Sequence, residues 1–163
     1  MDKWEEILNN TFEKISEVED KKQSEKEKAE QNRAKAKNFV SSVVAPAFEE
    51  IKPSLEMHNQ KVSITTGETY DKKEQYATIT VKPNDPSSRL RFVYQLTFVP
   101  YPNDILISYH GKFVDEIGYE YELVPSGQIP SGITGNDISK ISKDEIKEDF
   151  VLKYQYMVES HLE

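Results

Sequence analysis

The three histidines are the residues of this sequence best suited to metal binding or acid–base chemistry, and their spacing supports neither. His58, His110 and His161 lie far apart, and none belongs to the HxH, HxxxH or HExxH patterns that bring two ligands to one metal ion. The sequence has no cysteine, which excludes thiolate ligands, disulfides and a thiol nucleophile. We therefore expect no metal site and no cofactor.

A serine, a histidine and an aspartate occur close together, as Ser108, His110 and Asp115. Ser108 and His110 share one face of a predicted strand, but no GxSxG elbow or oxyanion-binding loop accompanies them. The glycines after residue 126 lack the spacing of a dinucleotide-binding or phosphate-binding loop. We predict that the protein is not an enzyme.

Two groups of residues could bind a small ligand. Arg89, Arg91 and His110 lie on the polar face of predicted strands and could bind an anionic or polar molecule, although charge pairs on a solvated sheet have the same composition. Alternatively, tyrosines could line a pocket between the sheet and the C-terminal helix, because tyrosine offers an apolar ring and a polar tip. The tyrosines concerned are Tyr94, Tyr109, Tyr119, Tyr121, Tyr154 and Tyr156.

The charge balance limits the partners. The chain of 163 residues has 21 Lys and Arg against 29 Asp and Glu, a net charge of −8, which disfavours binding to nucleic acid and to anionic membranes. The excess of acids lies in residues 116–163. Glu148 and Asp149 in this segment could dock a basic protein.

Residues 1–37 form a charge-dense segment without glycine or proline, which predicts a long helical arm or a weak coiled coil. Its apolar residues recur at three- and four-residue steps along one side of the helix. They are Trp4, Ile7, Leu8, Phe12, Ile15 and Val18. We expect self-association, or docking to another protein, through Trp4, Leu8, Phe12 and Ile15; the alternative is that the stripe folds back onto the domain.

Residues 38–163 have the pattern of an α+β domain. A helix over 38–58 is expected to kink or restart at Pro46 and Pro53, since an interior proline removes a backbone hydrogen bond. Strands within 61–124 alternate apolar and polar residues, which is typical of an antiparallel meander of about five strands covered on one face. The predicted strands are 61–66, 76–82, 89–99, 105–114 and 119–124.

The last third of the chain is predicted to close this domain. A loop over 125–141 precedes a helix over 142–162, which begins with a capping box at Ser142 and Glu145. This helix and the helix over 38–58 would together cover the apolar face of the sheet.

The N-terminal residues MDKWEEILNN do not resemble a secretion signal, and the apolar runs are too short to span a bilayer, so a cytoplasmic protein is expected. The interpretation that follows is a non-enzymatic protein-interaction module, such as an acidic accessory, inhibitor or chaperone-like protein, that oligomerises through its N-terminal helix. The alternative is a small-molecule-binding domain with a tyrosine-lined pocket.

Overall fold

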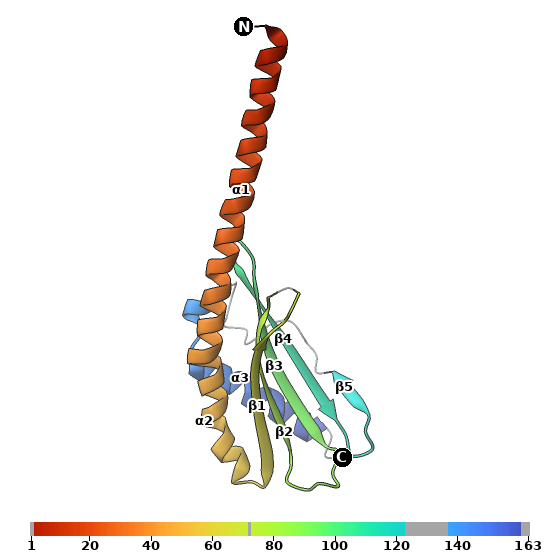
Figure 1. Cartoon of the computed structure of the whole chain (residues 1–163). Coiled ribbons are helices and arrows are strands. Elements are labelled where there is room, and N and C mark those ends of the chain that lie inside the picture. The colour runs from red at the N-terminus through yellow and green to blue at the C-terminus, as the bar shows by residue number, and fades with distance from the viewer. Residues whose placement is uncertain (1, 72, 123–136, 161–163) are drawn as a thin grey trace.

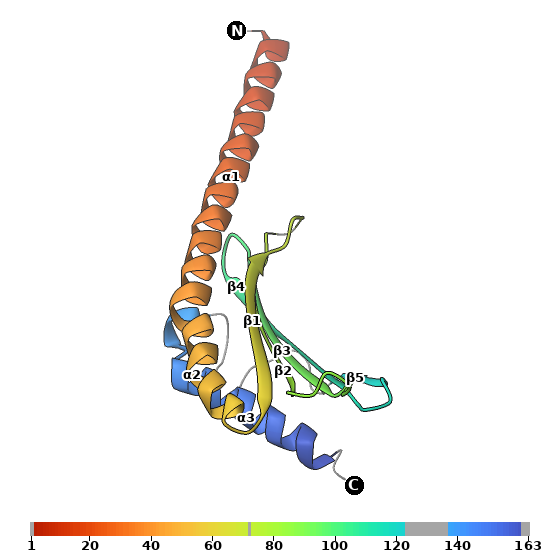
Figure 2. The same cartoon turned by 60° about the horizontal axis from the view of Figure 1, so that its bottom comes forward.

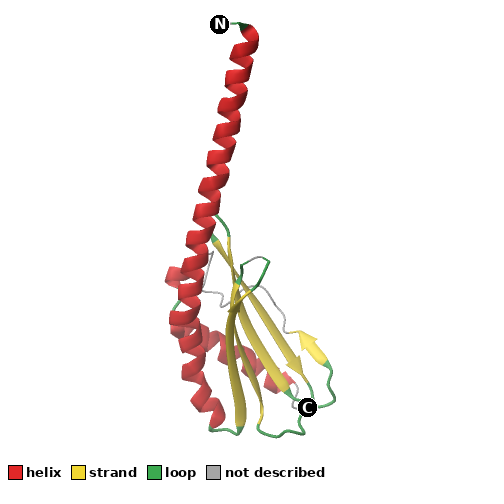
Figure 3. Cartoon of the chain, viewed as in Figure 1, coloured by secondary structure: helices red, strands yellow, loops and turns green. Residues whose placement is uncertain are grey.

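One long helix and the sheet that follows it determine the shape of the molecule (Figure 1). The computed structural model describes residues 2–71, 73–122 and 137–160. Within them the chain forms an N-terminal helix of 54 residues, a five-stranded antiparallel meander and a C-terminal helix that packs against the sheet (Figure 3). The predicted α+β class is confirmed.

The N-terminal helix is continuous where the sequence predicted a break. Helix α1 (Lys3–Phe39) continues through a π-helical turn (Val40–Val44) into α2 (Ala45–Glu56). The prediction of a separate helix over 38–58 that restarts at a proline is therefore wrong. The arm and the first core helix are two parts of one rod.

The π-helical turn explains how this rod accommodates its first proline. The Ala45 N–H bonds to the Val40 carbonyl, five residues back, so the hydrogen-bond register changes just before Pro46. Pro46 then occupies the first turn of α2, where its missing N–H and fixed φ are tolerated. Pro53 lies in the last turn, and its carbonyl still accepts a hydrogen bond from Met57 at 3.0 Å.

The sheet agrees with the predicted meander. Its strands pair antiparallel in chain order and are β1 (Gln60–Glu68), β2 (Gln75–Pro83), β3 (Arg91–Pro100), β4 (Ile105–Val114) and β5 (Glu120–Glu122). Buried residues alternate with more exposed ones along β2, β3 and β4. One face therefore forms the core, as the period of two predicted.

Helix α3 (Lys143–Ser160) lies on the same side of the sheet as α2 (Figure 2). It begins at the predicted capping box, where the Glu145 N–H bonds to the Ser142 hydroxyl at 3.2 Å. Helices α1, α2 and α3 each place one phenylalanine edge-on against an aromatic ring of β3, with ring centroids 5.4–5.8 Å apart. The pairs are Phe39–Phe98, Phe48–Tyr94 and Phe150–Phe92.

The predictions for the last third of the chain can be compared with the structure only in part. The loop residues Pro125–Asn136, the strand end at 123–124 and the helix end at 161–162 lie outside the described residues. Ile138–Lys140, predicted as loop, form a short 3-10 turn. None of the described helices combines the length and apolar character needed to cross a bilayer.

Candidate functional site

The apolar stripe of α1 lies on the part of the helix that extends beyond the sheet (Figures 1 and 2). Its six large side chains are 46–63% exposed, and no described residue of the domain covers them. They are Trp4, Ile7, Leu8, Phe12, Ile15 and Val18. We refer to these six residues as the arm stripe. The alternative that the stripe folds back onto the domain is therefore not observed among the described residues.

The arm is joined to the domain farther along α1. Asn32 donates a hydrogen bond from Nδ2 to the Tyr101 carbonyl at 2.6 Å. The guanidinium of the next residue, Arg33, forms a two-pronged ion pair with Glu68 on β1, with N–O distances of 2.7 and 2.8 Å. Gln75 donates to the same carboxylate at 2.5 Å. These bonds fix the direction in which the arm leaves the sheet.

The charge of Glu68 is stabilised by this arrangement. The hydrogen bond from Arg33, followed by the one from Gln75, lowers the pKa of Glu68 from 4.5 to about 2. The same carboxylate raises the pKa of Arg33. The pair is therefore ionised at neutral pH and joins α1 to the hairpin of β1 and β2.

A buried polar cluster lies between α3 and the sheet. The Tyr94 hydroxyl donates to Asp149 Oδ2 at 2.5 Å, and Lys153 Nζ contacts Asp149 Oδ1. Lys153 Nζ also lies 4.3 Å from the centre of the Tyr109 ring. Asp149 is only 5% exposed, which corrects the prediction that it belongs to an acidic docking surface. It faces inward because it shares the apolar side of α3 with Ile146 and Phe150.

The two buried tyrosines of this cluster differ in one hydrogen bond. Their ring centroids lie 4.9 Å apart, but the buried Tyr109 hydroxyl has no hydrogen-bond partner among the described residues. Burial, followed by the nearby charge of Asp149, raises the pKa of both phenols. Both groups are therefore neutral in the physiological range, and they form part of the core.

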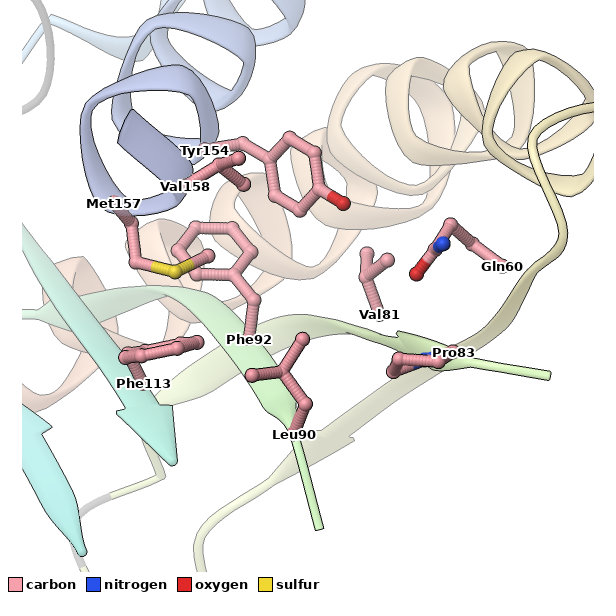
Figure 4. A pocket seen from close by; sticks show the side chains of 9 residues that line it. All are labelled: Gln60, Val81, Pro83, Leu90, Phe92, Phe113, Tyr154, Met157 and Val158. Carbon is pink, nitrogen blue, oxygen red and sulfur yellow. The ribbon is translucent and has the colours of Figure 1, made fainter. Parts of the chain in front are cut away.

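A small apolar cavity lies between α3 and strands β1 to β4 (Figure 4). It measures about 80 Å³ and is lined by Gln60, Val81, Pro83, Leu90, Phe92, Phe113, Tyr154, Met157 and Val158. Of the predicted tyrosine lining, only Tyr154 contributes. Tyr119, Tyr121 and Tyr156 are exposed, while Tyr94 and Tyr109 are packed in the core.

The predicted ligand surface on the outer face of the sheet does not converge. His110 pairs with Gln95 and Arg91 with Val114, so the two side chains are separated by four residues along the strands, about 13 Å. Arg89 precedes β3 and donates to the Ile117 carbonyl at 3.5 Å. Lys112 forms an ion pair with Glu120 at 2.8 Å. The polar residues here are arranged as cross-strand pairs.

Two of these features were not predicted from the sequence. Arg33 and Glu68 had no predicted role, since nothing local relates residues that are far apart in the chain. The buried position of Asp149 did have a signal, because the acid lies at helical spacing between Ile146, Phe150 and Lys153. The predicted acid Glu148 is exposed, beside Lys147, which forms ion pairs with Glu50 and Asp144.

Comparison with known proteins adds no assignment: no family model matches the chain, and neither a curated protein nor a solved structure is significantly similar to it.

Proposed function

We propose that this chain is a non-enzymatic protein-interaction module that self-associates through the arm stripe of α1. The observation that carries the proposal is the exposure of all six stripe side chains on a projecting helix. Full burial of one Val, Leu, Ile or Phe side chain stabilises a structure by about 1.5–3 kcal/mol. A stripe of this kind therefore provides a strong driving force for association.

The remainder of α1 supports the same proposal. Residues 19–28 are polar and exposed, so they contribute no packing that would hold the distal turns of the helix in place. In proteins, most of the stability of a helix comes from packing of its apolar face against another element. Pairing of arms would supply this packing, about 20–40 Å along the helix from Asn32, where α1 meets the domain.

The test is sedimentation velocity of the full chain and two double variants. Leu8→Lys with Ile15→Lys places two charges within the stripe, whereas Asn9→Lys with Ser16→Lys adds the same charges at the same spacing outside it. We expect the wild type and the outer variant to sediment as an oligomer and the stripe variant as a monomer. A monomeric wild type, or an oligomer that persists in the stripe variant, would overturn the proposal.

A second candidate is the binding of a small apolar ligand in the cavity beneath α3. What favours it is the apolar lining, with polar atoms only from Gln60 and the Tyr154 hydroxyl at its side (Figure 4). Its volume of about 80 Å³ is far below the several hundred Å³ of sites for drug-sized ligands, so a short alkyl chain is the appropriate class.

This candidate is tested by NMR titration of the Met157 methyl group with n-butanol. Saturable shifts that disappear in Val81→Phe, which fills the cavity, are the expected result. Shifts that do not saturate, or that persist in Val81→Phe, would exclude this site.

A further inference from the structure

We infer that the arm pairs with a second copy of this chain in parallel and in register, as a two-stranded coiled coil over residues 4–19. This inference rests on the proposed function, because it specifies the partner and the orientation at the same stripe. It is carried by the spacing of the stripe and by the residues on its two flanks.

Four residues of the arm stripe, together with Thr11, have the spacing of a coiled-coil seam. Trp4, Leu8, Thr11, Ile15 and Val18 follow one another at steps of four, three, four and three residues. This places Leu8 and Ile15 at the a positions of a heptad, and Trp4, Thr11 and Val18 at the d positions. A repeat of 3.5 residues keeps such a seam facing its partner along the whole contact.

The flanking residues complement each other across a parallel pair. Ile7 and Lys14 occupy g positions, and Phe12 and Glu19 occupy the following e positions. In a parallel dimer, each g residue faces the next e residue of the second copy. Ile7 then contacts Phe12 of the second copy and Lys14 pairs with Glu19, and each contact occurs twice by symmetry.

Lys14 and Glu19 are available for this contact. Both side chains are exposed on the projecting part of α1, and within the described residues neither forms an ion pair. They lie on opposite flanks of the stripe, so they do not face each other on the same helix. Neither is therefore paired on its own helix, and a second, parallel arm would bring an opposite charge to each.

An antiparallel pair fits these flanks less well. In the register that aligns Leu8 with Val18, e positions face e positions and g positions face g positions. Glu5 would then face Glu19, and Lys14 would face Lys14 of the second copy. The other antiparallel register, with Trp4 on Ile15, pairs Leu8 with the polar Thr11 and places Val18 beyond Lys3, where α1 begins. Like charges at such sites suppress the wrong pairing.

The same reasoning indicates where the pairing ends. Beyond Val18 the seam positions are Lys22, Glu25 and Ala29. A parallel pair that continued here would place Lys22 against Lys22 and Glu25 against Glu25, which is unfavourable. The two helices therefore separate after Asp20, and the two domains lie at the same end of the dimer, apart from one another.

A charge swap in the full chain tests the orientation. Lys14→Glu and Glu19→Lys, each made alone, place like charges at both symmetric contacts and should weaken dimerisation about tenfold at low salt. The double variant restores opposite charges in the parallel pair and should dimerise as the wild type does. A double variant that associates no better than the single variants would overturn the parallel orientation.

Disulfide trapping provides a second readout, because the natural sequence has no cysteine. Val18→Cys should form a disulfide between two copies under mild oxidation, while Glu13→Cys, on the opposite side of the helix, should not. An antiparallel pair would instead link Val18→Cys to Leu8→Cys. If the wild type is a dimer and Val18→Cys cross-links to Leu8→Cys, only the parallel orientation is contradicted. If the wild type is a monomer, the proposed function itself is contradicted.

Discussion

Tyr94 and Tyr109 show how two neighbouring residues of one type can contribute differently to stability. Both are almost fully buried, on adjacent strands of the core face. The Tyr94 hydroxyl donates to the buried carboxylate of Asp149, while that of Tyr109 has no partner within the part of the chain that the structure describes. A buried polar group without a partner lowers stability, whereas one that satisfies a buried charge raises it.

The matched substitutions Tyr94→Phe and Tyr109→Phe should therefore differ. Tyr94→Phe removes a hydrogen bond to a buried charge and should lower the free energy of unfolding by about 1–3 kcal/mol. Tyr109→Phe removes only an unpaired hydroxyl and should be neutral or slightly stabilising. Urea denaturation of both variants provides the comparison. Equal losses would mean that the Tyr109 hydroxyl is hydrogen-bonded in solution.

The elements were predictable to the extent that their signals are local. The alternation Leu90, Phe92, Tyr94, Leu96 and Phe98 predicted the central strand and its inward face, and Ser142 with Glu145 predicted the start of α3. These patterns depend only on neighbouring residues and on the period of the element.

The break in the helix was predicted wrongly because the turn that accommodates Pro46 depends on packing in the core. Pro46 and Pro53 each cost an isolated helix a hydrogen bond, but the π-helical turn at Val40–Val44 shifts the register just ahead of the first proline. Packing of Val44, Ala47 and Phe48 in the core holds this turn in place. Tertiary contacts thus outweighed the local propensity.

The attachment of α1 to β1 should depend on pH through Glu68. Its pKa in the folded protein, about 2, is below its value of 4.5 in an unfolded chain. A carboxylate with a lowered pKa stabilises the fold fully above its unfolded pKa, and that contribution is lost as the pH falls toward 2. Glu68→Gln should therefore be less stable than the wild type near neutral pH, and the difference should shrink between about pH 4.5 and 2.

Urea denaturation of both proteins across this range measures the difference. Glu49→Gln, which removes the same charge from an exposed position on α2, serves as the control. A difference between Glu68→Gln and the wild type that stays constant from neutral pH to pH 2 would show that the ion pair with Arg33 contributes nothing.

At the scale of the whole molecule, a helical arm extends from an α+β domain and carries its large apolar residues at the far end (Figure 1). The periodicity of Trp4, Leu8 and Ile15 predicted the helix and its apolar side from the sequence. That the stripe is exposed could not be predicted, because it depends on where the helix points. Arg33, Asn32 and Glu68 set that direction through contacts between distant parts of the chain.

The most direct test of self-association through the arm is the mass of the full chain in solution, measured by sedimentation equilibrium over a wide range of concentrations. A monomer has a mass of 18.9 kDa. We predict that the weight-average mass rises with concentration to twice this value and levels off there, as expected for a closed dimer. A mass that remains at 18.9 kDa up to the highest concentration would contradict the central claim.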